Sequence, residues 1–95
     1  MKPYLLKKEE IKELGAKISD WEIHPKHIER NIIFKNFIDA FSFITKVALL
    51  AEKYNHHPNW ENVYSQVKIK LFTHDLGGIS SLDHAMASEI NNLLK

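Results

Sequence analysis

The chain has 95 residues, of which 44% are hydrophobic and 26% charged, and its formal net charge is +1. This composition predicts one soluble globular domain over residues 1–95, with no basic footprint for nucleic acid. The absence of cysteine excludes a disulfide, a thiol nucleophile and a thiolate metal site, and no apolar run reaches the roughly 18 residues of a membrane span.

The first predicted element is a helix over residues 7–16. Ile11, Leu14 and Ile18 recur at helical spacing among charged residues. Gly15 marks the predicted end of this helix, and Ser19-Asp20 follows as a turn. The chain turns charged too early for a signal peptide, so we expect a cytoplasmic protein.

Two strands are predicted over residues 21–24 and 27–35, because the hydrophobic period changes to two. His24-Pro25-Lys26 interrupts the run like a turn, which predicts a hairpin. Trp21 opens the first strand. It is either a core or edge aromatic, or a wall against which a flat ligand lies.

The longest predicted helix spans residues 37–54, with Asn36 as its N-cap. Apolar residues fill about half of its circumference, more than a helix that covers one sheet requires. The members of this arc are Phe37, Ala40, Phe41, Phe43, Ile44, Val47, Ala48, Leu50, Ala51 and Tyr54, and Ile38 and Leu49 lie outside it. Either a second subunit covers the excess, giving a homodimer or homotetramer, or the helix is wedged within its own subunit.

A second alternating run extends from Val63 to His74, with Val63, Ser65, Val67, Ile69, Leu71 and Thr73 on the predicted core face. Gly77-Gly78 predicts a tight turn. Ser80 and Asp83 have the spacing of a capping box at the start of a helix over residues 81–94. The predicted fold is α+β, a four-stranded antiparallel sheet with three helices on one face, in the order α-β-β-α-β-β-α.

Three of the six histidines lie at junctions between these elements: His56, His57 and His74. Histidine can give and take protons near neutral pH. Neighbouring side chains on an extended chain point to opposite sides, and Pro58 favours an extended residue before it. A small organic ligand between the two adjacent histidines is therefore more natural than a metal ion. The alternatives are surface histidines that bind nothing and an Asp83 that serves only as a helix cap.

A longer motif runs through this region. It consists of an acidic residue, His-His-Pro, an aromatic residue, a histidine and an aspartate at fixed spacing. In this chain these are Glu52, His56-His57-Pro58, Tyr64, His74 and Asp83. With Trp21, F-I-D-A-F-S-F-I-T-K-V-A-L-L-A-E-K and N-H-H-P-N-W-E-N-V-Y, the chain resembles the pterin-4a-carbinolamine dehydratase family over residues 11–94.

This resemblance implies dehydration of 4a-hydroxytetrahydrobiopterin to quinonoid dihydropterin, which recycles the pterin cofactor of aromatic amino acid hydroxylases. It implies no metal and no cofactor for the reaction. The implied catalytic residues are His56 and His74 as acid and base, with His57 mainly positioning the pterin. The implied substrate-binding residues are Trp21, Glu52, Pro58 and Asp83, of which Glu52 and Asp83 orient or polarise histidines. Asn55 departs from relatives that carry aspartate there, so His56 lacks a neighbouring carboxylate that would make it more basic.

Other functions stay open. Animal members of the family also act as dimerisation cofactors of a transcription factor, so the chain could be a binding module. His56, His74, Asp75 and Asp83 could instead bind zinc, since histidine and carboxylate are zinc ligands. A pterin role related to the molybdenum cofactor is a further alternative, against which the complete motif argues.

Overall fold

Four strands and three α-helices make up the structure, a computed structural model that describes residues 2–95. The elements are α1 (Lys8–Lys17), β1 (Glu22–Ile23), β2 (Ile28–Ile33), α2 (Phe37–Tyr54), β3 (Asn59–Val63), β4 (Gln66–Leu71), a 3-10 helix η1 (His74–Leu76) and α3 (Ser81–Leu93). The α+β class and the predicted order of helices and strands are confirmed. Over residues 2–95, no helix has both the length and the apolarity that crossing a bilayer requires.

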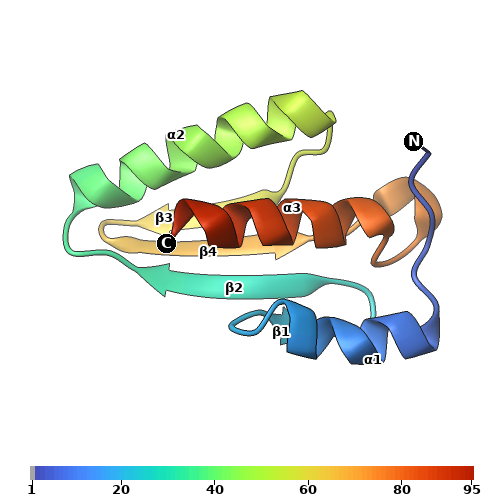
Figure 1. The fold of residues 1–95 in the computed structure, drawn as a ribbon. Helices are drawn as coiled ribbons and strands as arrows, with labels where there is room; N and C mark the ends of the chain where they lie inside the picture. Colours follow the sequence, from blue (N-terminus) through green and yellow to red (C-terminus); the bar gives the residue numbers. More distant parts are fainter. Residues whose placement is uncertain (1) are drawn as a thin grey trace.

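The strands form one antiparallel sheet in the order β1-β2-β4-β3. Ile28 of β2 lies opposite Leu71 of β4, and Asn59 of β3 lies opposite Lys70. The start of β2, the start of β3 and the end of β4 are therefore at the same end of the sheet. Figure 1 shows α2 and α3 over the sheet and α1 beside the short β1.

The buried hydrophobic residues form one cluster between the helices and one face of the sheet. Along β4, Val67, Ile69 and Leu71 have no exposed surface, whereas Lys68 and Lys70 are only half-buried. The helices contribute Leu14, Ala40, Phe43, Ile44, Val47, Ala51, Met86, Ala87 and Ile90. This alternation is typical of an antiparallel sheet covered on one side.

The predicted end of the first helix was wrong. Gly15 lies inside α1, which continues to Lys17. Leu14 and Ile18 are each only 1% exposed, so both pack into the core from one continuous face. That packing outweighs the roughly 1 kcal/mol that glycine costs inside a helix.

The second alternating run is interrupted by a turn that divides β3 from β4. Tyr64 adopts a left-handed backbone with φ of 54°, and the Asn62 Nδ2 atom donates hydrogen bonds to the backbone oxygens of Tyr64 and Gln66. Val63 is 70% exposed, so its assignment to the core face was wrong. Val67 to Thr73 follow the prediction, because the pairing of β4 with β2 fixes their register.

Candidate active site

The site begins where α3 begins. Ser80 is the N-cap of α3, and its Oγ accepts a hydrogen bond from the Leu82 N–H at 3.2 Å. The Asp83 Oδ2 atom accepts from the Ser80 N–H at 2.9 Å. The predicted capping box is therefore confirmed, and it holds the Asp83 carboxylate at a helix N-terminus, where negative charge is favoured.

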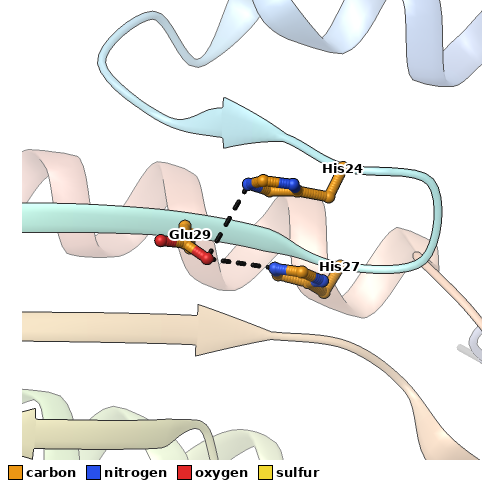
Figure 2. A group of neighbouring side chains, drawn as sticks. All are labelled: His24, His27 and Glu29. Atoms are coloured by element: carbon orange, nitrogen blue, oxygen red, sulfur yellow. Dashed lines mark hydrogen bonds and ion pairs between the residues drawn. The ribbon is translucent and has the colours of Figure 1, made fainter.

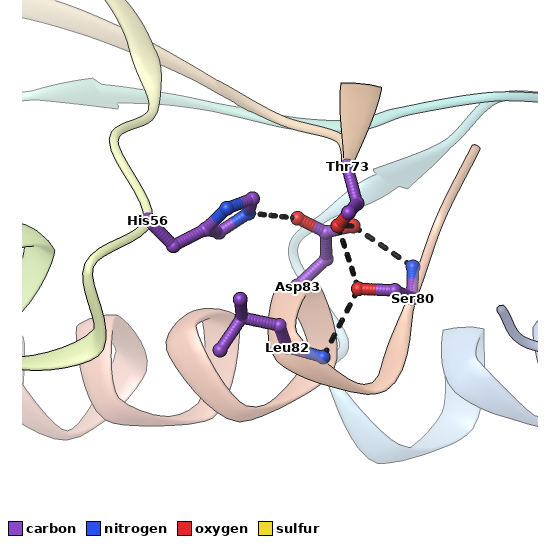
Figure 3. A network of polar contacts seen from close by, with 5 residues as sticks. All are labelled: His56, Thr73, Ser80, Leu82 and Asp83. Atoms are coloured by element: carbon purple, nitrogen blue, oxygen red, sulfur yellow. Dashed lines mark hydrogen bonds and ion pairs between the residues drawn. The ribbon is translucent and has the colours of Figure 1, made fainter. Parts of the chain in front are cut away.

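Asp83 has further partners beyond the cap, and its side chain has no exposed surface. The Thr73 hydroxyl donates to Oδ2 at 2.8 Å, and the His56 ring lies against Oδ1 with its Nε2 atom 2.5 Å away. Figure 3 shows the carboxylate between the end of the sheet, the start of α3 and the loop that carries His56. A buried carboxylate requires such partners, because desolvation without hydrogen bonds costs several kcal/mol.

The contact with Asp83 determines which nitrogen of His56 is bonded. An ionised carboxylate only accepts hydrogen bonds, so Nε2 carries the proton that faces Asp83. The second ring nitrogen, Nδ1, is then the atom left for proton exchange. The side chain of His56 is 12% exposed, which leaves a narrow opening to solvent or to a ligand.

His57 has a separate carboxylate partner. Its Nε2 atom lies 2.6 Å from Oε2 of Glu52, and the two side chains are 58% and 76% exposed. Asn55 ends α2 in the left-handed conformation, φ 50°, which asparagine tolerates well. The adjacent histidines thus pair with carboxylates in different surroundings, one buried and one at the surface.

His74 is exposed at the start of η1 and follows Thr73 directly. Because Asn59 lies opposite Lys70, the His56-His57 loop and the segment after β4 lie at the same end of the β3–β4 hairpin. The hydrogen bonds of Asp83 to Thr73 and His56 join these two segments. The structure thus brings His56, Thr73 and Asp83 into contact, with His74 one residue away in the chain.

Trp21 precedes β1 and contacts α3 at a different place from this site. It is 6% exposed, and its indole N–H donates to Oδ1 of Asn91 at 2.7 Å. Asn91 is eight residues after Asp83, about 12 Å along the helix. This is the position of a core aromatic, and a contact between Trp21 and a pterin stays a prediction. Pro58 is half-buried immediately before β3, and Tyr64 is exposed in the β3–β4 turn.

The sequence reasoning missed Thr73 as a site residue. Thr73 is 8% exposed, and its hydroxyl contacts both Ser80 and Asp83. A polar residue at the end of an otherwise apolar strand face was the available signal. The alternative zinc set of His56, His74, Asp75 and Asp83 does not converge in residues 2–95, where the metal-type cluster involves other residues.

The fold and the site together define a class of protein. Its members are α+β proteins with a buried aspartate–histidine pair at one end of the sheet, next to further histidines. The sequence pattern of the family described as "Pterin 4 alpha carbinolamine dehydratase" matches residues 4–93. The chain belongs to this family.

Individual relatives agree with this assignment. A Prochlorococcus marinus subsp. pastoris protein, provisionally named pterin-4-alpha-carbinolamine dehydratase, is 65% identical over 100% of this chain and 99% of its own length. A Synechococcus protein with the same name is 48% identical over 94% of this chain and 96% of its own length.

Two solved structures are similar. The transcriptional coactivator/pterin dehydratase from Brucella melitensis superimposes with a TM-score of 0.91 and 35% identity, covering 97% of this chain and 100% of that one. A pterin dehydratase-like RuBisCO assembly factor of the alpha-carboxysome has a TM-score of 0.63, covering 77% of this chain and 84% of that one. At 23% identity this second match shows the shared fold alone.

Proposed function

We propose that the protein dehydrates 4a-hydroxytetrahydrobiopterin to quinonoid dihydropterin and water. The observation that carries the proposal is the contact between His56 and the buried Asp83, 2.5 Å from Nε2 to Oδ1, at the end of the sheet where His57 and His74 also lie. Membership of the pterin-4a-carbinolamine dehydratase family supplies the class of substrate.

The reaction requires two proton transfers and no net oxidation. The bond from C4a to the hydroxyl oxygen breaks, a proton joins that oxygen to form water, and a ring nitrogen loses its proton. An acid and a base on either side of the ring are sufficient, and histidine suits both roles near neutral pH. We assign these roles to His56 and His74, with His56 oriented by Asp83.

The proposal is tested by following quinonoid dihydropterin formation directly from the carbinolamine, with and without a chelator. We expect the purified protein to accelerate the dehydration, and the chelator to leave the rate unchanged. A folded protein that leaves the uncatalysed rate unaltered would contradict the proposed activity. Loss of the rate with chelator would contradict the metal-free mechanism.

Replacement of His57 by alanine is expected to raise KM and leave kcat nearly unchanged. His57 is exposed and bonded to the exposed Glu52, which suits a group that holds the pterin in both the ground and transition states. Removing such uniform binding affects KM alone. The matched variant His56→Ala should lower kcat, partially if His74 can still transfer the proton. Steady-state kinetics of both variants decide the assignment, and the reverse pattern would exchange the two roles.

A second candidate function, as a protein-binding module, is favoured by the exposed apolar side chains of α2. Ile38, Phe41 and Leu49 are 74%, 54% and 68% exposed. Their positions i, i+3 and i+11 form one stripe along the helix. The Brucella relative carries both a coactivator and a dehydratase description. We propose a second copy of the chain as the occupant of this stripe, which gives a homodimer or homotetramer.

The assembly proposal predicts that Ile38→Lys with Leu49→Lys lowers the mass in solution and keeps the fold. Phe43, which the sequence pattern also offered for this surface, is only 4% exposed and packs in its own subunit. Phe43→Lys should therefore unfold the protein and serves as the contrast. Light scattering together with circular dichroism measures both effects. An unchanged mass in the folded double variant would show that the stripe does not hold the copies together.

A further inference from the structure

A second group of histidines lies at the hairpin that joins β1 to β2. The backbone N–H of His24 donates a hydrogen bond to the backbone oxygen of His27 at 2.9 Å, so the two residues face each other across the Pro25-Lys26 turn. Ile23 and Ile28 pair and pack on the core. Their neighbours therefore point to the opposite face of the sheet, because side chains alternate along a strand.

Glu29 joins this group from β2. Its side chain is 11% exposed, and its Oε1 atom lies 3.1 Å from Nε2 of His27 and 3.7 Å from Nε2 of His24. Figure 2 shows both imidazole rings directed at this one carboxylate. The rings are stacked, with centroids 4.4 Å apart and planes at 8°. Glu22, opposite Glu29 in the sheet, places its Oε1 atom 3.3 Å from Nε2 of His24.

These separations fit the ligand shell of a small metal ion. Two ligands at about 2.0–2.1 Å from a tetrahedral metal lie roughly 3.3 Å apart, and the three contacts between nitrogen and oxygen are 3.1, 3.3 and 3.7 Å. The ligand atoms of His24, His27 and Glu29 all lie within 4.8 Å of one another. Rotation of these side chains could bring all three atoms to one shared ion.

The His24 ring carries an unpartnered polar atom within this group. Its Nε2 is buried and makes no hydrogen bond in spite of two carboxylate oxygens nearby. A dication would satisfy both nitrogens and the carboxylate together. The hydrogen bond from His27 lowers the pKa of Glu29 against the opposing effect of burial, and Lys68 and His24 lower it further.

We propose that His24, His27 and Glu29, with a Glu22 oxygen as the fourth ligand, bind a divalent transition-metal ion of the Zn²⁺ type. Two imidazoles with carboxylates suit zinc, copper or nickel and not calcium or magnesium, which prefer oxygen ligands. The site shares no residue with the proposed catalytic group. The positive charge of Lys68 opposes metal binding, because its Nζ atom lies 3.7 Å from the other Glu29 oxygen. We therefore expect a moderate affinity for the metal ion.

The test is a Zn²⁺ titration of the ¹⁵N-labelled protein, followed by long-range proton–nitrogen NMR spectra of the imidazoles. We expect the Nε2 resonances of His24 and His27 to shift together and saturate. His27→Gln and Glu29→Gln should each weaken binding by more than about tenfold, since loss of outer partners alone costs 10–100-fold. Binding should also weaken as the pH falls, because protons compete for the imidazoles.

Two further variants distinguish Zn²⁺ binding at this site from non-specific Zn²⁺ binding to surface histidines. Lys68→Gln removes the opposing charge and should strengthen Zn²⁺ binding, whereas His57→Gln removes a surface histidine elsewhere and should leave it unchanged. Zn²⁺ should raise Tm in the wild type and lose this effect in Glu29→Gln, whose fold is checked by circular dichroism. Shifts confined to His56 and His57, or equal affinity in folded Glu29→Gln, would overturn the proposal.

Discussion

Replacement of Asp83 by asparagine is expected to lower kcat by about 10²–10⁴, the range that positioned acid–base catalysis contributes, while the protein stays folded. The amide oxygen can take the place of Oδ2 and accept from Thr73 and Ser80, as the carboxylate does. The amide nitrogen then faces His56, and it donates hydrogen bonds only. His56 must accept at Nε2, which moves its proton to Nδ1 and removes the nitrogen proposed for catalysis.

The contrasting variant is Asp83→Ala, which removes every acceptor. It leaves the Thr73 hydroxyl, the Ser80 N–H and the His56 ring without their shared partner. We expect a loss of about 3–5 kcal/mol in the free energy of unfolding, as for other broken buried pairs. Urea unfolding and steady-state kinetics measure the two variants together. Wild-type kcat in Asp83→Asn would contradict the orienting role of this carboxylate.

Replacement of His74, one of the two proposed proton-transfer groups, by alanine is also expected to lower kcat by about 10²–10⁴. His74 is exposed at the first position of η1 and makes no side-chain hydrogen bond within the described residues. Its loss should therefore change the free energy of unfolding by only about 0.5 kcal/mol. The combination of intact stability and lost turnover is what an exposed catalytic histidine predicts.

The matched control for His74 is its neighbour Asp75, which is exposed in the same turn. Asp75→Ala disturbs η1 to a similar degree and should keep most of the activity. The profile of kcat against pH supplies a second readout, since loss of one acid or base removes one limb of a bell-shaped curve. Wild-type turnover of His74→Ala on the carbinolamine would remove His74 from the mechanism.

Much of the fold followed from local patterns. The helix over residues 37–54 has the predicted bounds, because Asn36 caps its start and Asn55 ends it in a left-handed conformation. The capping box of Ser80 and Asp83 was likewise predicted from the spacing of neighbouring residues. The end of α1 and the turn at Tyr64 were not predicted, because core packing in one case and strand pairing in the other outweighed the local signal.

The sequence by itself predicted the α+β class and the family motif, since these depend on periodicity and spacing along the chain, and the resemblance to the family supplied the candidate catalytic residues. Only the tertiary structure decided that Asp83 is both a helix cap and the partner of His56, 27 residues earlier in the chain. The same holds for Thr73, and for His24 and Glu29, which β1–β2 pairing brings together. Contacts between segments depend on strand register and helix docking, and no single stretch of sequence encodes them.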